Sequence, residues 1–286
     1  MKKQFKSFIK SNKFSYSIAI SILKLFKNNK QTQYFTNIFS NVVNGSLVLT
    51  LKNIPGEHEI GVHSHLLKRI LITKEYEPDI TKLIKSNINS EKDAINIGAN
   101  IGLFANLIAS KINKDHKVLA IEPTEGAYKL LASNIKRNEN SSKVITFNGI
   151  ASERSGNFVL NVIPGNEEYS SLGELISPST KNLTSLKVEI KGETIDNLVN
   201  KYNINPGLLV IDVEGAEHSV LKGAINTIKK HKPIIISEID DKFLIQQNSS
   251  SKQVIDFLEG MGYKVVDTNS NIIQYPFTGN IIAVFK

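Results

Sequence analysis

Short apolar segments alternate with helical patterns from about residue 90 onward. After each of the first two segments, apolar residues recur at spacings of three and four, as in Leu103, Leu107 and Ile108. Buried strands that alternate with helices are typical of a parallel sheet with helices on both faces. The predicted strands are Asp93–Ile97, Val118–Ile121, Val144–Phe147, Leu208–Ile211 and Ile234–Ile236.

The end of the chain departs from this alternation. Tyr263–Val266 and Ile281–Phe285 are two strand candidates, and the residues between them are polar with no helical pattern. Strands joined without a helix pair most simply as antiparallel neighbours. We therefore expect an antiparallel hairpin that closes one edge of the sheet.

The flanking segments divide the chain into three parts. Residues 91–286 form the main domain, and residues 46–90 are expected to supply short strands and a helix that lead into it. An insertion at about residues 151–192 interrupts the main domain, because Phe158–Ile163 and Leu186–Ile190 alternate like paired strands. A long irregular segment of this kind in a compact domain often carries function.

Residues 1–45 are predicted to be a basic, amphipathic N-terminal extension. Residues 1–30 mix lysines with apolar residues, but the uncharged stretch Phe14–Leu23 is too short to span a bilayer, and no small-residue cleavage site follows it. Two interpretations stay open: a helix that packs on the domain, or a helix that lies on an anionic membrane surface. We expect a cytoplasmic protein whose membrane contact, if any, is peripheral, at the inner face.

The amino-acid composition and charge exclude several kinds of functional site. The absence of cysteine excludes disulfides, cysteine-ligated metals and a thiolate nucleophile. The formal net charge is +8, yet many of the basic residues lie in the first 30 positions. A nucleic-acid groove across the main domain is therefore not expected, and neither is a dedicated metal site.

A glycine-containing turn joins the first predicted strand to its helix. The sequence Asn96-Ile97-Gly98-Ala99-Asn100-Ile101-Gly102 lets the chain turn tightly beside helix amides that favour a negative group, and Glu122 ends the next strand. A carboxylate there suits a ribose diol, as in dinucleotide folds. However, Asn100 occupies the place of the middle glycine of a dinucleotide motif, which favours an adenosyl ligand without a pyrophosphate.

A second cluster of acids follows the fourth and fifth strands. Asp212 and Glu214 come directly after Leu208–Ile211, and Glu238 ends the strand that begins at Ile234. The carboxyl ends of parallel strands share one edge, where ligands bind. These acids are candidates to orient a hydroxyl or to hold a divalent cation, although they also suit helix capping. Glu217 and His218 are weaker candidates.

Several ordered motifs resemble the FkbM-type S-adenosylmethionine-dependent methyltransferases over roughly residues 70–286. They are YEPDIT at 76–81, INIGANIGLFA at 95–105, AIEPTEGAYKLLASNIKRN at 120–138, TIDNL at 194–198, LLVIDVEGAEHSVLKGA at 208–224 and PIIISEI at 233–239. Two positions depart from the family pattern, with Asn96 in place of the usual Asp and Val210 in place of a common Lys.

The resemblance implies a Rossmann-like α/β fold of the class I methyltransferases, with a mostly parallel seven-stranded sheet and S-adenosylmethionine as cofactor. It implies O-methylation of a sugar, glycan or natural-product hydroxyl, with a role in polysaccharide biosynthesis among the expectations. An NAD-dependent oxidoreductase and a non-catalytic adenosyl-binding protein remain alternatives. The expected catalytic residues are Asp212, Glu238 and Glu214, and the expected cofactor residues are Asn96, Gly98, Ala99, Asn100, Gly102, Glu122, Pro123 and Glu77.

Overall fold

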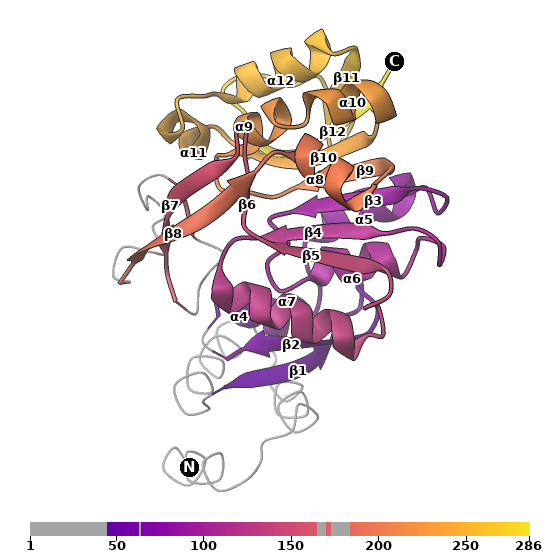
Figure 1. The fold of residues 1–286 in the computed structure, drawn as a ribbon, viewed down its shortest axis with the longest axis vertical. Coiled ribbons are helices and arrows are strands. Elements are labelled where there is room, and N and C mark those ends of the chain that lie inside the picture. Colours follow the sequence, from indigo (N-terminus) through magenta and orange to yellow (C-terminus); the bar gives the residue numbers. More distant parts are fainter. Residues whose placement is uncertain (1–44, 63, 165–169, 173–183) are drawn as a thin grey trace, which may run out of the picture.

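The computed structural model describes residues 45–62, 64–164, 170–172 and 184–286. Its centre is a seven-stranded sheet in the order β11-β12-β10-β9-β3-β4-β5, which confirms the predicted α/β class (Figure 1). All neighbours from β10 to β5 pair in parallel, whereas β12 is antiparallel to both β10 and β11. The strands are β3 (Asp93–Ile97), β4 (Val118–Glu122), β5 (Val144–Asn148), β9 (Pro206–Ile211), β10 (Ile234–Asp240), β11 (Tyr263–Asp267) and β12 (Thr278–Phe285).

The predicted C-terminal hairpin is therefore present, and it has a particular order. β12 lies between β10 and β11, so the last strand of the chain inserts beside the parallel strands and β11 forms the edge.

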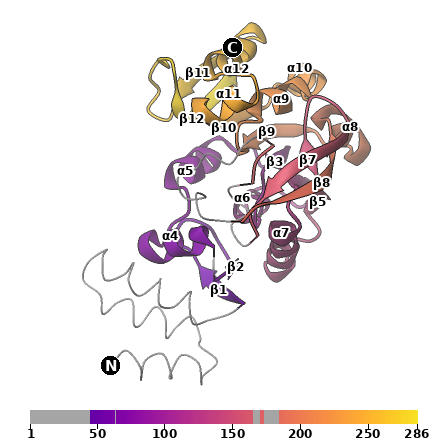
Figure 2. The ribbon, with the colours of Figure 1, turned by 90° about the vertical axis from the view of Figure 1, so that its left-hand side faces the viewer.

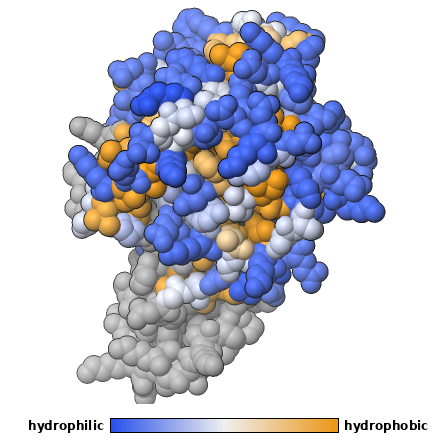
Figure 3. Space-filling view, viewed as in Figure 1, coloured by the Kyte–Doolittle hydropathy of each residue, from blue (hydrophilic) through white to orange (hydrophobic). Residues whose placement is uncertain are grey.

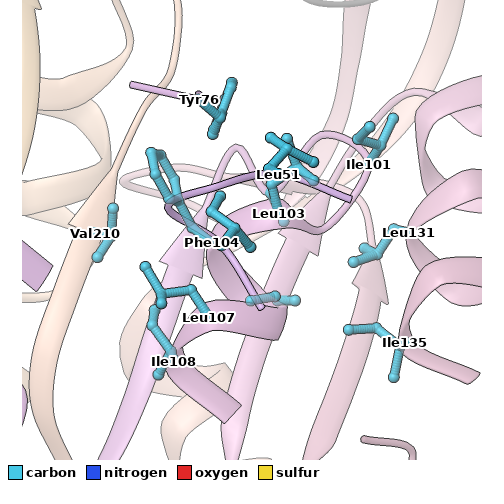
Figure 4. Close-up of a cluster of buried hydrophobic side chains, with 14 of the residues drawn as sticks. Leu51, Tyr76, Ile101, Leu103, Phe104, Leu107, Ile108, Leu131, Ile135 and Val210 are labelled. Atoms are coloured by element: carbon cyan, nitrogen blue, oxygen red, sulfur yellow. The ribbon is translucent and has the colours of Figure 1, made fainter. Parts of the chain in front are cut away.

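Helices cover both faces of the sheet, as the pattern predicted. Successive residues of a strand point to opposite faces, and Ala94 packs in one hydrophobic cluster while Ile95 packs in the other. The first face carries α5 (Pro78–Asn87), α6 (Leu103–Ala109) and α7 (Glu125–Arg137). Figure 4 shows Phe104 and Leu107 of α6 and Leu131 and Ile135 of α7, which belong to one buried cluster. The second face carries α8 (Ile195–Tyr202), α9 (Glu217–Lys222), α10 (Ile225–His231), α11 (Asp241–Gln246) and α12 (Ser251–Gly260).

The segment before the sheet adds a small layer of its own. β1 (Ser46–Thr50) and β2 (Glu57–Gly61) form an antiparallel pair, followed by α4 (His65–Thr73). β2 is attached to α7 because the Asn134 side chain accepts the Glu59 N–H at 2.6 Å and donates to the Glu59 carbonyl at 3.0 Å. This attachment holds α4 near the edge of the main sheet.

The insertion forms a separate three-stranded sheet. β8 (Leu186–Glu193) pairs antiparallel with β7 (Gly156–Val162) and parallel with the short β6 (Ile150–Ala151). The alternation in the sequence predicted β7 and β8 correctly. The hairpin projects from the body of the molecule on the side where β3 and β4 end (Figure 1).

The helical stretch after β9 is interrupted. Val220, Leu221 and Ile225 have the spacing of one continuous helix, but the structure has α9 and α10 with a break at Gly223. A Cβ on Gly223 would lie 2.0 Å from the Ser152 carbonyl oxygen, and the Asp196 carboxylate caps the N-terminus of α10 through the Asn226 and Thr227 amides. Tertiary contacts therefore set this break, and local periodicity does not reveal them.

The N-terminal extension and its proposed membrane contact through residues 1–30 lie outside the described residues. Among the helices that the structure does describe, none combines the length and apolar character needed to cross a bilayer.

Candidate functional site

A cavity of about 420 Å³ lies at the carboxyl ends of β3, β4, β9 and β10. Figure 2 looks toward this edge of the sheet, with α4 and α5 on one side and the β7–β8 hairpin on the other. Three segments far apart in the sequence form its walls: α4 with the turn into α5, the loops that follow the parallel strands, and the inserted β-sheet. This is the place where open α/β sheets bind ligands.

The glycine turn after β3 forms the floor of the cavity. Gly98, Asn100 and Gly102 all have positive φ angles, of 75°, 48° and 86°. The turn is held against β4, because the Gly98 and Ala99 amides both donate to the Ile121 carbonyl, at 3.0 and 2.9 Å. Gly98 also touches the next loop, since a Cβ there would lie 1.8 Å from the Asp212 carbonyl oxygen. Only glycine fits this contact.

Glu122 links the turn to β4 from a buried position on the cavity wall. One carboxylate oxygen accepts the Asn100 N–H at 2.8 Å. The other accepts the Thr124 N–H at 2.9 Å and the Thr124 hydroxyl at 2.6 Å. The residue predicted to bind a ribose therefore also fixes the conformation of the turn, and the sequence spacing alone does not show this second role.

The three acids predicted as catalytic all line the cavity. Asp212 follows β9, and its amide donates to the Ile97 carbonyl at 2.9 Å, which places it beside the end of β3. Burial raises the pKa of Asp212 well above its usual value, and the carboxylates of Glu238, Glu214 and Glu77 raise it further, with Arg69 acting in the opposite direction. Asp212 therefore retains a proton to higher pH than an ordinary aspartate.

Glu238 occupies the rim of the same cavity. Its side chain is partly exposed to solvent. Partial burial is the largest cause of the raised pKa of Glu238, and the nearby Glu77 carboxylate raises that pKa further. Arg69 again counteracts this shift. The structure thus brings Asp212, Glu214 and Glu238 together on one wall, with Arg69 as a neighbouring cation.

The wall formed by α4 and the turn into α5 contains residues that the sequence analysis did not name as site residues. Tyr76 packs against Phe104 with ring centroids 4.9 Å apart and lines the cavity. Its neighbour Glu77, predicted as a cofactor residue, adopts φ 36° at the start of α5 and forms an ion pair with Arg69 at 2.8 Å. Arg69 and His65 come from α4. The YEPDIT motif marked this turn, but the contribution of α4 has no recognisable motif.

The predicted cofactor residues divide into two groups. Gly98, Asn100, Glu122, Pro123 and Glu77 line the cavity, whereas Asn96, Ala99 and Gly102 do not. Gly102 instead gives room to Leu131, whose Cδ1 would lie 2.6 Å from a Cβ at this position.

Asn96 is fully buried in β3, and neither polar atom of its side-chain amide has a hydrogen-bond partner among the residues that the structure describes. Its neighbours across the sheet are Val210 and Ala120. The two departures from the family pattern, Asn96 and Val210, are therefore adjacent: an uncharged amide faces an apolar side chain where the pattern has an Asp and a Lys.

Glu217 and His218 lie outside the cavity lining. Glu217 is buried at the start of α9 and accepts the Gly215 N–H at 3.3 Å; burial raises its pKa well above the usual value. His218 forms a hydrogen bond of 2.7 Å with the Ser249 hydroxyl. Both contacts stabilise the loop after β9. Within the part of the chain that the structure describes, no group of three or more His, Asp or Glu side chains is arranged to hold a metal ion.

Comparison with known families agrees with this arrangement. Residues 96–265, more than half of the chain, match the family described as "Methyltransferase FkbM domain". The chain belongs to this family. The match runs from β3 into β11, so it contains the glycine turn, Glu122 and all three acids of the cavity wall, and it confirms the resemblance seen in the sequence motifs.

Individual relatives of this FkbM domain are distant. Methyltransferase sdnD from Sordaria araneosa is 29% identical over 162 residues, which cover 48% of this chain and 62% of that protein. The methyltransferase FkbM from Methylobacillus flagellatus KT has a TM-score of 0.45 at 17% identity, over 77% of this chain and 53% of that one. The Bacillus cereus O-methyltransferase, solved in complex with SAH, has a TM-score of 0.45 at 13% identity, over 93% and 96%. The chain spans less than two thirds of the first two relatives.

Membership of a methyltransferase family confirms the expectation that the cofactor is S-adenosylmethionine. The residues of the cavity fit this molecule. Gly98 presents bare backbone because a side chain there would collide with the Asp212 carbonyl, and five carboxylates on the cavity wall complement a cationic sulfonium. We expect Gly98, Asn100, Glu122 and Pro123 to contact it.

Proposed function

We propose that this FkbM domain transfers a methyl group from S-adenosylmethionine to a hydroxyl group of a sugar, glycan or natural product. The observation that carries the proposal is the position of Asp212: its backbone touches Gly98 of the predicted cofactor turn, and its carboxyl group lines the same cavity. A base beside the cofactor turn is what O-methylation requires. S-adenosylmethionine supplies the electrophilic methyl group.

The work of the protein is then alignment and proton transfer. Holding an acceptor oxygen in line with the reacting methyl group contributes up to about 7–11 kcal/mol. Asp212 accepts the hydroxyl proton in its deprotonated form as the new bond forms, and its raised pKa makes that carboxylate a stronger base than an ordinary one. Glu238 and Glu214 line the same cavity, where they can orient the acceptor hydroxyl or relay the proton to solvent.

The charge of the cavity supports an uncharged acceptor. Glu77, Glu122, Asp212, Glu214 and Glu238 all line it. The guanidinium of Arg69 already pairs with Glu77. Because like charges repel, the site disfavours an acceptor that carries a phosphate or carboxylate group and suits an uncharged polyol.

The alternatives predict different behaviour. An NAD-dependent oxidoreductase requires close approach of a pyrophosphate where Asn100 carries a side chain. A non-catalytic adenosyl-binding protein has no need of the acids that meet at the cavity. A cytoplasmic location and a peripheral membrane contact through residues 1–30 remain part of the proposal, tested by vesicle sedimentation of the chain with and without that segment.

The direct test of the reaction uses S-adenosylmethionine carrying a ¹³C-labelled methyl group. We incubate the protein with defined acceptor pools: neutral glycosides, amino sugars, sugar phosphates and phenols. We expect label in O-methyl products of the neutral hydroxyl acceptors, identified by carbon NMR and mass spectrometry. Exclusive labelling of the amino groups of the amino sugars would show that the acceptor class is wrong.

A further inference from the structure

One face of the β7–β8 hairpin is apolar along its whole length. Directly opposite residues of an antiparallel pair lie on the same face of the sheet. The register therefore groups six apolar side chains on one face, as the pairs Phe158–Ile190, Leu160–Val188 and Val162–Leu186. No polar side chain interrupts this face between Phe158 and Val162 or between Leu186 and Ile190.

The other face of the same hairpin has the opposite character. Its pairs are Asn157–Lys191, Val159–Glu189 and Asn161–Lys187, so Val159 is its single apolar residue in this stretch. Both faces belong to the same two strands. The difference between them therefore cannot be a general preference of strands for apolar residues, and it indicates that the apolar face has a contact of its own.

The apolar face begins inside the cavity and ends in solvent. Leu160 is 4% exposed and lines the cavity, together with Ile150 of the adjoining β6. Val188, opposite Leu160, is 36% exposed. Leu186, two residues before it at the start of β8, is 53% exposed. We name Leu160, Val162, Leu186 and Val188 the apolar strip. Figure 3 shows apolar atoms gathered where this hairpin projects from the molecule.

A contiguous apolar surface that leads out of a ligand cavity is typical of a binding site. The rest of the cavity wall is rich in carboxylates, which an apolar group avoids because its approach would strip them of water. A ligand with one polar end and one apolar end therefore has a single favourable orientation here. Its polar end faces the acids, and its apolar end lies along the strip.

We propose that the apolar strip is a binding subsite for an apolar portion of the acceptor, attached to the part that carries the methylated hydroxyl. This inference rests on the proposed function, and it narrows the acceptor class to amphiphilic molecules, such as a sugar with an alkyl or aromatic substituent. Leu160 holds the start of the apolar group, and Val188 and Leu186 cover its continuation.

The test measures binding as a function of chain length. Glucose and n-butyl, n-hexyl and n-octyl β-D-glucosides, each below its critical micelle concentration, are titrated by calorimetry into the full chain with SAH present. Contact with the strip tightens binding by about two- to fourfold for each methylene added. The double variant Leu186→Ser/Val188→Ser removes most of this dependence, and Leu186→Ser alone removes part of it. Val159→Ser, equally exposed at 55% on the opposite face, keeps the wild-type dependence.

Three results would overturn the proposal: no dependence on chain length in the wild-type protein, an unchanged dependence in the double variant, or an equal loss in Val159→Ser. Circular dichroism confirms that each variant is folded. The titration with SAH is recorded separately. If the dependence on chain length persists while SAH does not bind, the proposed function fails and the strip remains a ligand site. If SAH binds but affinity for the glucosides does not depend on chain length, the proposed function stands and the subsite proposal fails.

Discussion

The Asp212→Asn variant is expected to turn over about 10²–10⁴-fold more slowly than the wild-type protein, because a general base contributes an effect of this size. The amide keeps the shape of the side chain but cannot accept the proton. Affinity for S-adenosylmethionine is expected to change only a few-fold, since the Asp212 backbone, which touches Gly98, is unaltered. Single-turnover rates and calorimetry measure the two quantities separately.

The stability of this variant gives an independent readout. Because the pKa of Asp212 is raised in the folded protein, the unfolded chain releases this proton at lower pH, and the wild-type protein loses stability as pH rises from the ordinary aspartate value through the raised one. Asp212→Asn removes this loss. Without ligand, the variant should therefore melt at a higher temperature than the wild type at pH 8, and the difference should shrink toward pH 4.

Asp256→Asn on the exposed face of α12 is the matched control, since Asp256 forms a surface ion pair with Lys252. It should change neither turnover nor the pH dependence of melting. An Asp212→Asn variant that binds cofactor and turns over at the wild-type rate would remove Asp212 from proton transfer and leave alignment as its sole contribution.

The second large effect is expected for Gly98→Ala. The new Cβ would lie 1.8 Å from the Asp212 carbonyl oxygen, at a φ of 75° that alanine rarely adopts. Left-handed backbone and overpacking together cost about 2–5 kcal/mol, and relief of the clash has to separate the cofactor turn from the loop after β9. We therefore expect a lower melting temperature and loss of measurable SAH binding.

Gly260→Ala is the control for this substitution. Gly260 ends α12, and a Cβ there meets no atom within 4 Å. Alanine favours helix over glycine by about 1 kcal/mol, so this variant should be as stable as the wild type or slightly more stable. A Gly98→Ala protein that melts and binds SAH like Gly260→Ala would show that the close contact between the two loops is dispensable.

The central strands were predictable because a parallel sheet buries both faces of each strand. Asp93–Ile97 and Val118–Glu122 are buried at every position, so apolar residues occupy both faces of each strand and show no polar–apolar alternation, with Asn96 as the one polar residue inside β3. The hairpin of the insertion was predictable for the opposite reason: β7 and β8 alternate because one face is apolar and the other polar.

The cavity wall formed by α4 and the turn into α5 was much harder to predict. Arg69 lies on α4, whose buried face of Leu66, Leu67 and Ile70 looks like that of any amphipathic helix. Its position near the acids depends on the attachment of β2 to α7 through Asn134, a contact between residues 75 positions apart. Periodicity along the chain carries no signal for such contacts, and the break at Gly223 is unpredictable for the same reason.

The residue-level predictions for the glycine turn show what spacing can and cannot reveal. Glu122 was singled out as a ribose ligand because it ends the second strand, and the structure places it on the cavity wall. Its hydrogen bonds to Asn100 and Thr124 were not predictable, because they depend on how the turn folds back over β4.

The central claim is that this cavity is built to bind S-adenosylmethionine. Calorimetric titration of the full chain with S-adenosylmethionine, SAH and NAD tests it most directly. We predict micromolar binding of the first two, a free energy of about −8 kcal/mol, with NAD weaker by at least about 1.4 kcal/mol, or tenfold. Binding of NAD that equals or exceeds that of S-adenosylmethionine would contradict the claim.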